Sequence, residues 1–91
     1  MICKPSELRP GDLMTKMVRT LTLSRGGARS LIDIPVLGIV INVETGQFSY
    51  IITMLTEQGV SSLVAYMRDT GTDVGAPEWM SVELDMCEVV R

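Results

Sequence analysis

The stretch Leu8-Arg9-Pro10-Gly11-Asp12-Leu13 decides how this chain folds. Proline presets φ at the first corner of a turn, and glycine accepts the positive φ that the second corner requires. The chain is therefore expected to reverse at Pro10 and Gly11. From Leu13 to Leu23, Thr, Val, Leu and Met alternate with polar residues at strand-like spacing. The stretch predicts a long first strand whose first inward-facing residue is Leu13.

The rest of the chain consists of short predicted strands separated by turn signals. The segment Gly38–Glu44 is the clearest strand because it is rich in β-branched residues. Residues 24–30 contain two glycines and two arginines and predict a loop. Residues 83–86 predict a single 3-10 turn before the last strand. The other predicted strands are Leu31–Pro35, Val60–Met67, Glu78–Val82 and Cys87–Val90.

The segment Phe48–Gln58 fits two structures. Its apolar residues match a helical i, i+3, i+4, i+7 stripe, with Gly59 in the position of a helix C-cap. Its Tyr-Ile-Ile-Thr content instead favours a strand, in which case Glu57, Gln58 and Gly59 form a hairpin turn. Both structures remain open, and we favour the strand.

Composition indicates one small folded domain that covers residues 1–91. The chain is 46% hydrophobic and 21% charged, which is enough apolar material to offset the entropy of folding. It has four aromatic residues and seven methionines, so Val, Ile, Leu and Met must make most of the core. No apolar run approaches the ~20 residues that span a bilayer, and the N-terminus shows no signal-peptide pattern. We expect a protein that is neither exported nor bound to a membrane.

The order of these features resembles the small SH3-like barrels, including the KOW-type ones, and especially short uncharacterised proteins of marine and other bacterial viruses. The resemblance rests on Leu8–Leu13, Gly38–Glu44, Glu78-Trp79 and Leu84–Val90, about a third of the chain. It implies an all-β, SH3-like barrel of about five to seven short strands with a 3-10 turn before the last one. It also implies a location in the host cytoplasm or the virion.

The chain departs from a minimal KOW-type barrel in two places. The segment between Leu23 and Gly38 and the segment between Phe48 and Val60 are both longer than such a barrel needs. Because the shared residues belong to turns and core, the resemblance supports fold better than function. We therefore expect function to lie in the Ser24–Ser30 loop and in the segment from Phe48 to Val60.

No residue pattern predicts catalysis, a cofactor or a metal site. The chain has no histidine, which removes Ser-His and Cys-His nucleophile pairs and His-ligated zinc. Asp69-Thr70-Gly71 matches the aspartic protease triplet, but Arg68 precedes it and too little chain follows, so a polar turn is expected there. Asp69 and Asp73, with Glu78 nearby, lack the further acidic ligand of a calcium loop.

The two cysteines, Cys3 and Cys87, lie at opposite ends of the chain. One interpretation is two small, half-buried thiols. The other is that the fold brings the termini together and permits a Cys3–Cys87 bridge. Both interpretations remain open.

Two sets of residues are candidates for binding. The glycines between Arg25 and Arg29 expose backbone N–H groups beside two guanidinium groups, which suits an anion such as a nucleic-acid phosphate, and Lys16 and Arg19 extend this patch. The net charge of −3 and the lack of aromatic residues in the patch argue against it. A second set, Tyr66 and Trp79, is a candidate protein-binding surface.

The leading functional hypothesis is a non-enzymatic structural or interaction module, virus-encoded or virion-associated, that acts through self-association or binds another protein. The few charges in the long strands favour it, because such strand faces and edges are commonly covered by another subunit. The alternative is a nucleic-acid or ribonucleoprotein adaptor that uses the loop from Arg25 to Arg29.

Overall fold

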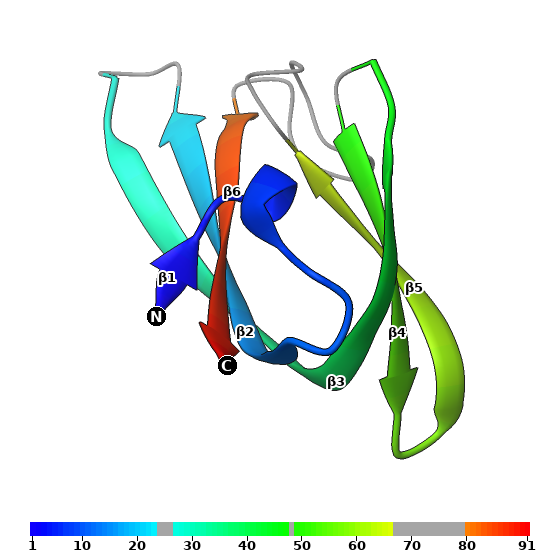
Figure 1. The fold of residues 1–91 in the computed structure, drawn as a ribbon. Helices are drawn as coiled ribbons and strands as arrows, with labels where there is room; N and C mark the ends of the chain where they lie inside the picture. Colours follow the sequence, from blue (N-terminus) through cyan, green and yellow to red (C-terminus); the bar gives the residue numbers. More distant parts are fainter. Residues whose placement is uncertain (24–26, 48, 67–79) are drawn as a thin grey trace.

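The computed structural model describes residues 1–23, 27–47, 49–66 and 80–91 (Figure 1). It confirms an all-β fold, in which six strands form one antiparallel sheet in the order β1-β6-β2-β3-β4-β5. The strands and the short 3-10 helix η1 are β1 Ile2–Cys3, η1 Pro5–Glu7, β2 Leu13–Leu23, β3 Arg29–Thr45, β4 Ser49–Thr56, β5 Gly59–Tyr66 and β6 Met80–Val90. In this order β1 and β5 are the outermost strands and, within the described residues, do not pair with each other. Closure of the sheet into an SH3-like barrel therefore stays a prediction.

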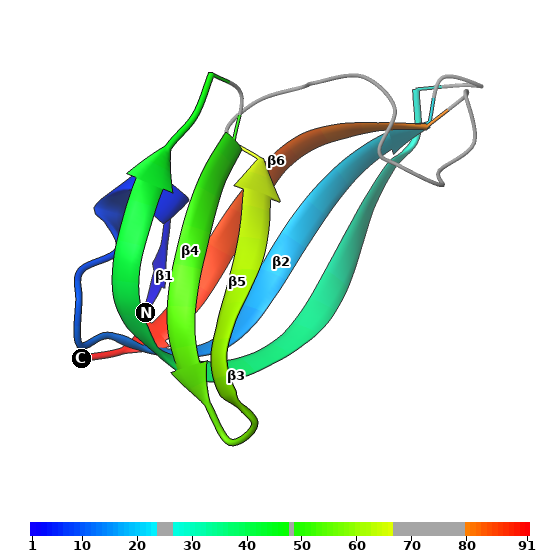
Figure 2. The same ribbon diagram turned by 90° about the vertical axis from the view of Figure 1, so that its right-hand side faces the viewer.

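The long strand β3 belongs to two halves of the sheet. Its first part, from Arg29 to Ile39, pairs with β2, and its last part, from Ile39 to Thr45, pairs with β4. Figure 2 shows the resulting bend, which places β4 and β5 in front of β2 and β6. Gly38 lies at this bend, and a Cβ atom there would stand 3.0 Å from the backbone oxygen of Leu55. A larger residue at Gly38 would force the neighbouring β4 backbone to shift, so the close approach at the bend favours glycine.

The predicted turn forms just before β2, and hydrogen bonds connect it to β3. The Asp12 N–H donates to the Arg9 carbonyl at 3.1 Å, and Gly11 has φ +95°. The Gly11 N–H donates to the Val40 carbonyl at 2.8 Å, and the Val40 N–H donates to the Asp12 carbonyl at 2.8 Å. Strand β2 begins at Leu13 as predicted. The expectation that Leu13 faces inward is wrong, because Met14 is the fully buried residue and Leu13 is half-buried on the other face.

The core fills the space between the two halves of the sheet. Its buried residues are aliphatic or sulfur-containing, as the composition predicted. They are Cys3, Leu8, Met14, Met17, Val40, Ile52, Met54, Ala65, Cys87 and Val89.

The structure decides between the two predictions for Phe48–Gln58. The described part is the strand β4, which is followed by a tight turn at Glu57 and Gln58 and by Gly59 with φ +105°. The helix is therefore wrong, and the hairpin is confirmed. The predicted segments Leu31–Pro35 and Gly38–Glu44 merge into the single strand β3.

The predicted 3-10 turn at residues 83–86 is wrong in its position. The 3-10 helix lies near the N-terminus at Pro5–Glu7, whereas β6 runs without a break from Met80 to Val90. Strand β2 is long enough to pair with all of β6. The register shifts between Thr20 and Leu21, so that Thr20 pairs with Leu84 and Leu21 with Val82, and β6 continues through the predicted turn as a strand.

Candidate interaction surfaces

An apolar row crosses the outer surface of the sheet. Leu13 on β2 pairs with Val90 on β6 and with Ile39 on β3. Ile39 pairs in turn with Leu55 on β4, which pairs with Val60 on β5. Side chains of paired residues lie on the same face, and their sequence neighbours face the core. The row therefore places five apolar side chains side by side in water across five strands.

Further apolar side chains extend this surface along β3, β4 and β5. Ile51 pairs with Val64, and both are exposed, as is Ile41 on β3, which lies at the register shift between Val40 and Asn42. We define the outer apolar face as Leu13, Ile39, Ile41, Ile51, Leu55, Val60, Val64 and Val90. Apart from the half-buried Leu13, their exposed fractions range from 40% for Ile51 to 69% for Val60. Single exposed aliphatic residues are ordinary, but a group gathered on one face marks an interaction surface. The polar side chains of Asn42, Thr53 and Ser62 lie between the apolar row and the Ile51–Val64 pair.

On the inner side of the sheet, Arg19 of β2 and Asp85 of β6 form a buried ion pair. The Asp85 side chain is fully buried, and that of Arg19 is 16% exposed. Arg19 Nε donates to Asp85 Oδ1 at 2.9 Å, and Arg19 Nη2 donates to Asp85 Oδ2 at 3.2 Å. This two-point contact is the strong form of an arginine–carboxylate interaction.

The same ion pair holds the edge of β5. The Tyr66 N–H donates to Asp85 Oδ2 at 2.8 Å, and Arg19 Nη2 lies 3.5 Å from the Val64 carbonyl oxygen. The Arg19 guanidinium also lies over the Tyr66 ring, 4.9 Å from its centre. Side chains of β2 and β6 thus bind backbone groups of β5, although β5 has no ladder with either strand among the described residues.

Two residues that were predicted to extend the anion patch, Lys16 and Arg19, lie on different faces of the sheet. Arg19 points inward to Asp85, whereas Lys16 lies on the opposite face of β2, where its Nζ is 3.4 Å from Glu88 and 3.6 Å from Asp33. The hydrogen bond that Lys16 donates to the Glu88 carboxylate and the charge of Asp33 raise the pKa of Lys16. Lys16 and Arg19 therefore do not extend a single patch.

The other predicted binding residues are only partly described. Arg29 is exposed at the start of β3, and Tyr66 lies against Arg19 in the ion-pair cluster. Arg25, Trp79, the Asp69-Thr70-Gly71 triplet and the acidic residues Asp73 and Glu78 lie outside the described residues. Binding at the Arg25–Arg29 loop stays a prediction.

Asp12 connects the N-terminal turn to the last residue of the sequence. Its carboxylate accepts hydrogen bonds from the Arg9 N–H at 2.9 Å and from Arg91 Nε at 3.0 Å. Arg91 Nη2 also donates to the Glu7 carbonyl at 2.8 Å. Burial by itself would raise the pKa of Asp12, but the hydrogen bonds from Arg9 and Arg91 and their charges outweigh it and lower the pKa.

The fold brings the two cysteines together. Cys3 on β1 pairs with Cys87 on β6, and both are buried free thiols. Burial raises the pKa of both thiols, and it raises that of Cys87 to about 12. The meeting of the termini is confirmed, and the structure contains thiols rather than a bridge. Neither thiol is a ready nucleophile, because the thiolate is the reactive form.

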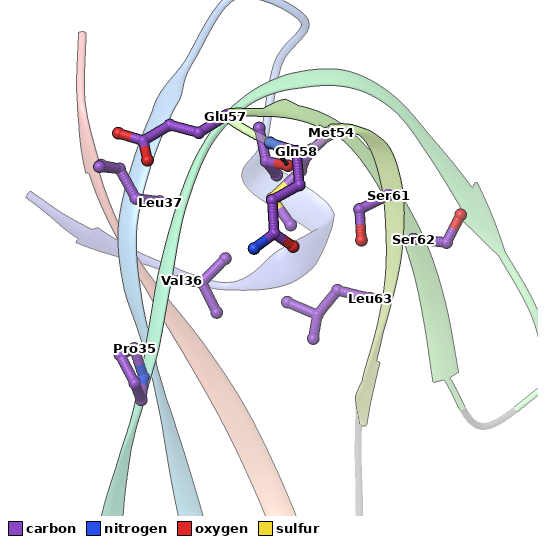
Figure 3. Close-up of a pocket in the computed structure, with 10 residues that line it drawn as sticks. Pro35, Val36, Leu37, Met54, Glu57, Gln58, Ser61, Ser62 and Leu63 are labelled. Atoms are coloured by element: carbon purple, nitrogen blue, oxygen red, sulfur yellow. Dashed lines mark hydrogen bonds between the residues drawn. The ribbon is translucent and has the colours of Figure 1, made fainter.

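A cavity of about 440 Å³ lies between the bend of β3 and the β4–β5 hairpin. In Figure 3, Val36 and Leu63 project into the space from its two sides, and Gln58 extends over it. Serines and threonine supply polar groups, and Glu57 is the only charged residue among the described residues that line the cavity. The lining residues are Pro35, Val36, Leu37, Met54, Thr56, Glu57, Gln58, Ser61, Ser62 and Leu63.

Comparison with protein-family models, with curated proteins and with solved structures gave no match. The resemblance to SH3-like and viral proteins accordingly stays a prediction. In the part of the chain that the structure describes, no helix is long and apolar enough to cross a membrane.

Proposed function

We propose that this chain is a non-enzymatic structural module that self-associates through its outer apolar face. The observation that supports it is the apolar row from Val90 through Leu13, Ile39 and Leu55 to Val60, which crosses five of the six strands. The row is uninterrupted by a charged side chain. The free energy falls when a matching surface covers apolar side chains of this kind and removes them from water.

The size of the face is sufficient for a dimer. Full burial of a Val, Leu or Ile side chain contributes about 1.5–3 kcal/mol, and the exposed half of each residue here retains roughly 1 kcal/mol. Summed over the eight residues in each of two copies, the face supplies on the order of 16 kcal/mol, which is comparable to an association cost of about 4–15 kcal/mol. A twofold arrangement is the simplest, because it brings the same face of both copies together.

The charges of the chain set the salt dependence of this association. Each copy carries a net charge of −3, and two copies repel one another. Glu44, which pairs with Ile51, lies at the margin of the face. Added salt screens such exposed charges and leaves apolar burial in place. Self-association should therefore become stronger as the salt concentration rises.

The test is the molar mass in solution, measured by light scattering over a range of protein concentrations. The wild-type mass should rise above 10.0 kDa with concentration, and Leu55→Arg should hold it at the monomer value, because Leu55 lies in the middle of the row. Leu31→Arg is the matched control, since Leu31 is 71% exposed at the other end of β3. A monomeric wild type at millimolar concentration, or equal dissociation by both variants, would contradict the proposal.

The alternative function, a nucleic-acid or ribonucleoprotein adaptor, has less support. Lys16 and Arg19 point to opposite faces of β2, and each pairs with a carboxylate. The remaining candidate for nucleic-acid binding is the loop from Arg25 to Arg29, in a chain of net negative charge. A virus-encoded or virion-associated role agrees with a self-associating module, and its support is the resemblance alone.

A further inference from the structure

The edge of β5 carries unused backbone groups. The Tyr66 N–H and the Val64 carbonyl point away from β4, because they meet Asp85 and Arg19. Backbone groups of alternate residues in a strand point to the same side. Those of Val60 and Ser62 therefore also point away from β4, and they have no hydrogen-bond partner within the described residues. The ion pair closes one end of this edge and leaves the other end open.

This open edge lacks the usual protection against pairing with another chain. Proteins protect edge strands with charged side chains, prolines, bulges or very short strands. Strand β5 has eight residues without a charge or a proline, and it pairs with β4 in unbroken register. By contrast, the part of β3 that pairs with β2 alone contains Asp33 and Pro35, and β1 has two residues.

The cavity lies beside this edge. Ser61, Ser62 and Leu63 of β5 form one of its walls, and Val36 of β3 stands opposite in Figure 3. In a strand added to β5, residues opposite Ser61 or Leu63 would turn to the same inner side as those two. One of their side chains would enter the cavity. Its volume of about 440 Å³ is ample for a Leu or Ile side chain.

The charges around the cavity limit what enters. Glu57 is the one charged residue among the described lining residues, and the nearby cation Arg19 is neutralised by Asp85. The chain as a whole is negative. An acidic segment is therefore disfavoured, whereas basic residues that flank an aliphatic one would lie near Glu57.

We propose that the open edge of β5 and the adjoining cavity bind an extended peptide segment of a partner protein. The segment adds as a strand along Val60 to Val64, places one aliphatic side chain between Val36 and Leu63, and carries basic rather than acidic flanking residues. Backbone hydrogen bonds supply affinity in this mode of recognition, and the pocket supplies specificity. The peptide would use the backbone edge of β5, whereas self-association uses outward side chains, two of which, Val60 and Val64, belong to the same strand.

The test is an NMR titration of the Leu55→Arg variant, in which self-association is suppressed, with the blocked heptapeptide Lys-Thr-Thr-Leu-Thr-Thr-Lys. The amide signals of Val60, Ser62 and Val64 should shift, and an analogue N-methylated on both threonines next to leucine should cause no shift. Ser62→Pro removes the open N–H from an edge position that tolerates proline and should weaken binding roughly tenfold. Ser62→Ala keeps the N–H and should bind like the parent.

A second variant tests the cavity. Ser61→Trp fills the space with an aromatic side chain and should also abolish the shifts, with the spectrum of the free protein showing that the fold is retained. Equal binding by Ser62→Pro and Ser62→Ala, or no shift at millimolar peptide, would overturn the proposal. Shifts of the β5 amides that depend on protein concentration without peptide would also overturn it, because a second copy would then occupy the edge. If the wild type proved monomeric but the peptide still shifted the β5 amide signals, the peptide site would be supported and the proposed self-association would not.

Discussion

Arg19 and Asp85 face each other across the β2–β6 ladder, and together they hold the backbone of β5, which belongs to the far end of the sheet. Without this pair, the described part of the chain has no hydrogen bond between β5 and the β2–β6 layer. The contact links the two halves of the bent sheet. It also determines how much of the β5 edge remains open.

Removal of Arg19 should destabilise the protein strongly. The Arg19→Met variant leaves the fully buried Asp85 carboxylate without its cation, which typically costs about 3–5 kcal/mol in the free energy of unfolding. Urea unfolding of the wild type and the variant measures this loss. In the double variant Arg19→Met, Asp85→Leu, no buried charge remains, and part of the stability should return. A loss below about 1 kcal/mol in Arg19→Met would show that the pair is not essential to the fold.

Acid should remove the contribution of Asp12. Its folded-state pKa is lowered from 3.8, so the folded protein binds this proton more weakly than the unfolded chain. The stabilisation is fully present above pH 3.8 and is lost as the pH falls through the lower folded-state pKa. The check is the difference in unfolding free energy between the wild type and Asp12→Asn at several pH values. The wild-type advantage should shrink below pH 4, and an advantage independent of pH would contradict the carboxylate's role.

Alkali should act through Cys87. Its pKa rises from 9.0 to about 12 on folding, because burial disfavours the thiolate. The folded state therefore holds this proton more tightly, and the related stability is present below pH 9.0 and lost as the pH rises toward 12. Cys87→Ala should lack this component of the pH dependence, although it loses some packing at every pH. At pH 8, a thiol reagent should modify Cys3 and Cys87 slowly in the native protein and rapidly in urea. Fast native labelling would be inconsistent with the buried pair.

Gly38→Ala should destabilise the bend of β3. The new Cβ would lie 3.0 Å from the Leu55 carbonyl oxygen and 3.1 Å from the Thr56 methyl group. Because backbone gives way less easily than a flexible side chain, we expect a cost of about 1–3 kcal/mol by thermal or urea unfolding. Gly46→Ala tests a similar 3.0 Å approach, to the Ser49 carbonyl, in the exposed β3–β4 turn, and it should cost less because that turn can adjust. An equal loss of unfolding free energy in both variants would contradict the expectation that the bend tolerates an added Cβ less well than the exposed turn.

Local sequence signals were sufficient for much of the fold. Pro10 and Gly11 fixed the start of β2, and β-branched residues marked the part of β3 that begins at Gly38. The 3-10 turn was misplaced because local pattern does not reveal that β2 is long enough to pair with all of β6. The bend at Gly38 likewise depends on the close approach of β4, which no local signal announces.

The site residues were harder to predict because they depend on register. Arg19 and Asp85 are separated by 66 positions and meet only through the alignment of β2 with β6. The outer apolar face also requires knowledge of which strands are neighbours, although the small number of charges in the strands did favour covered strand faces. Lys16 and Arg19 do not extend one patch because they are three positions apart, and a strand places such residues on opposite faces.

Self-association through the outer apolar face is tested most directly by methyl NMR of the wild type at increasing protein concentration. We predict that the methyl signals of Ile39, Leu55 and Val60 shift or broaden together with concentration, while those of the buried Val40 and Ile52 stay in place. Signals that remain unchanged up to millimolar concentration, with the diffusion coefficient of a monomer, would contradict the proposed function.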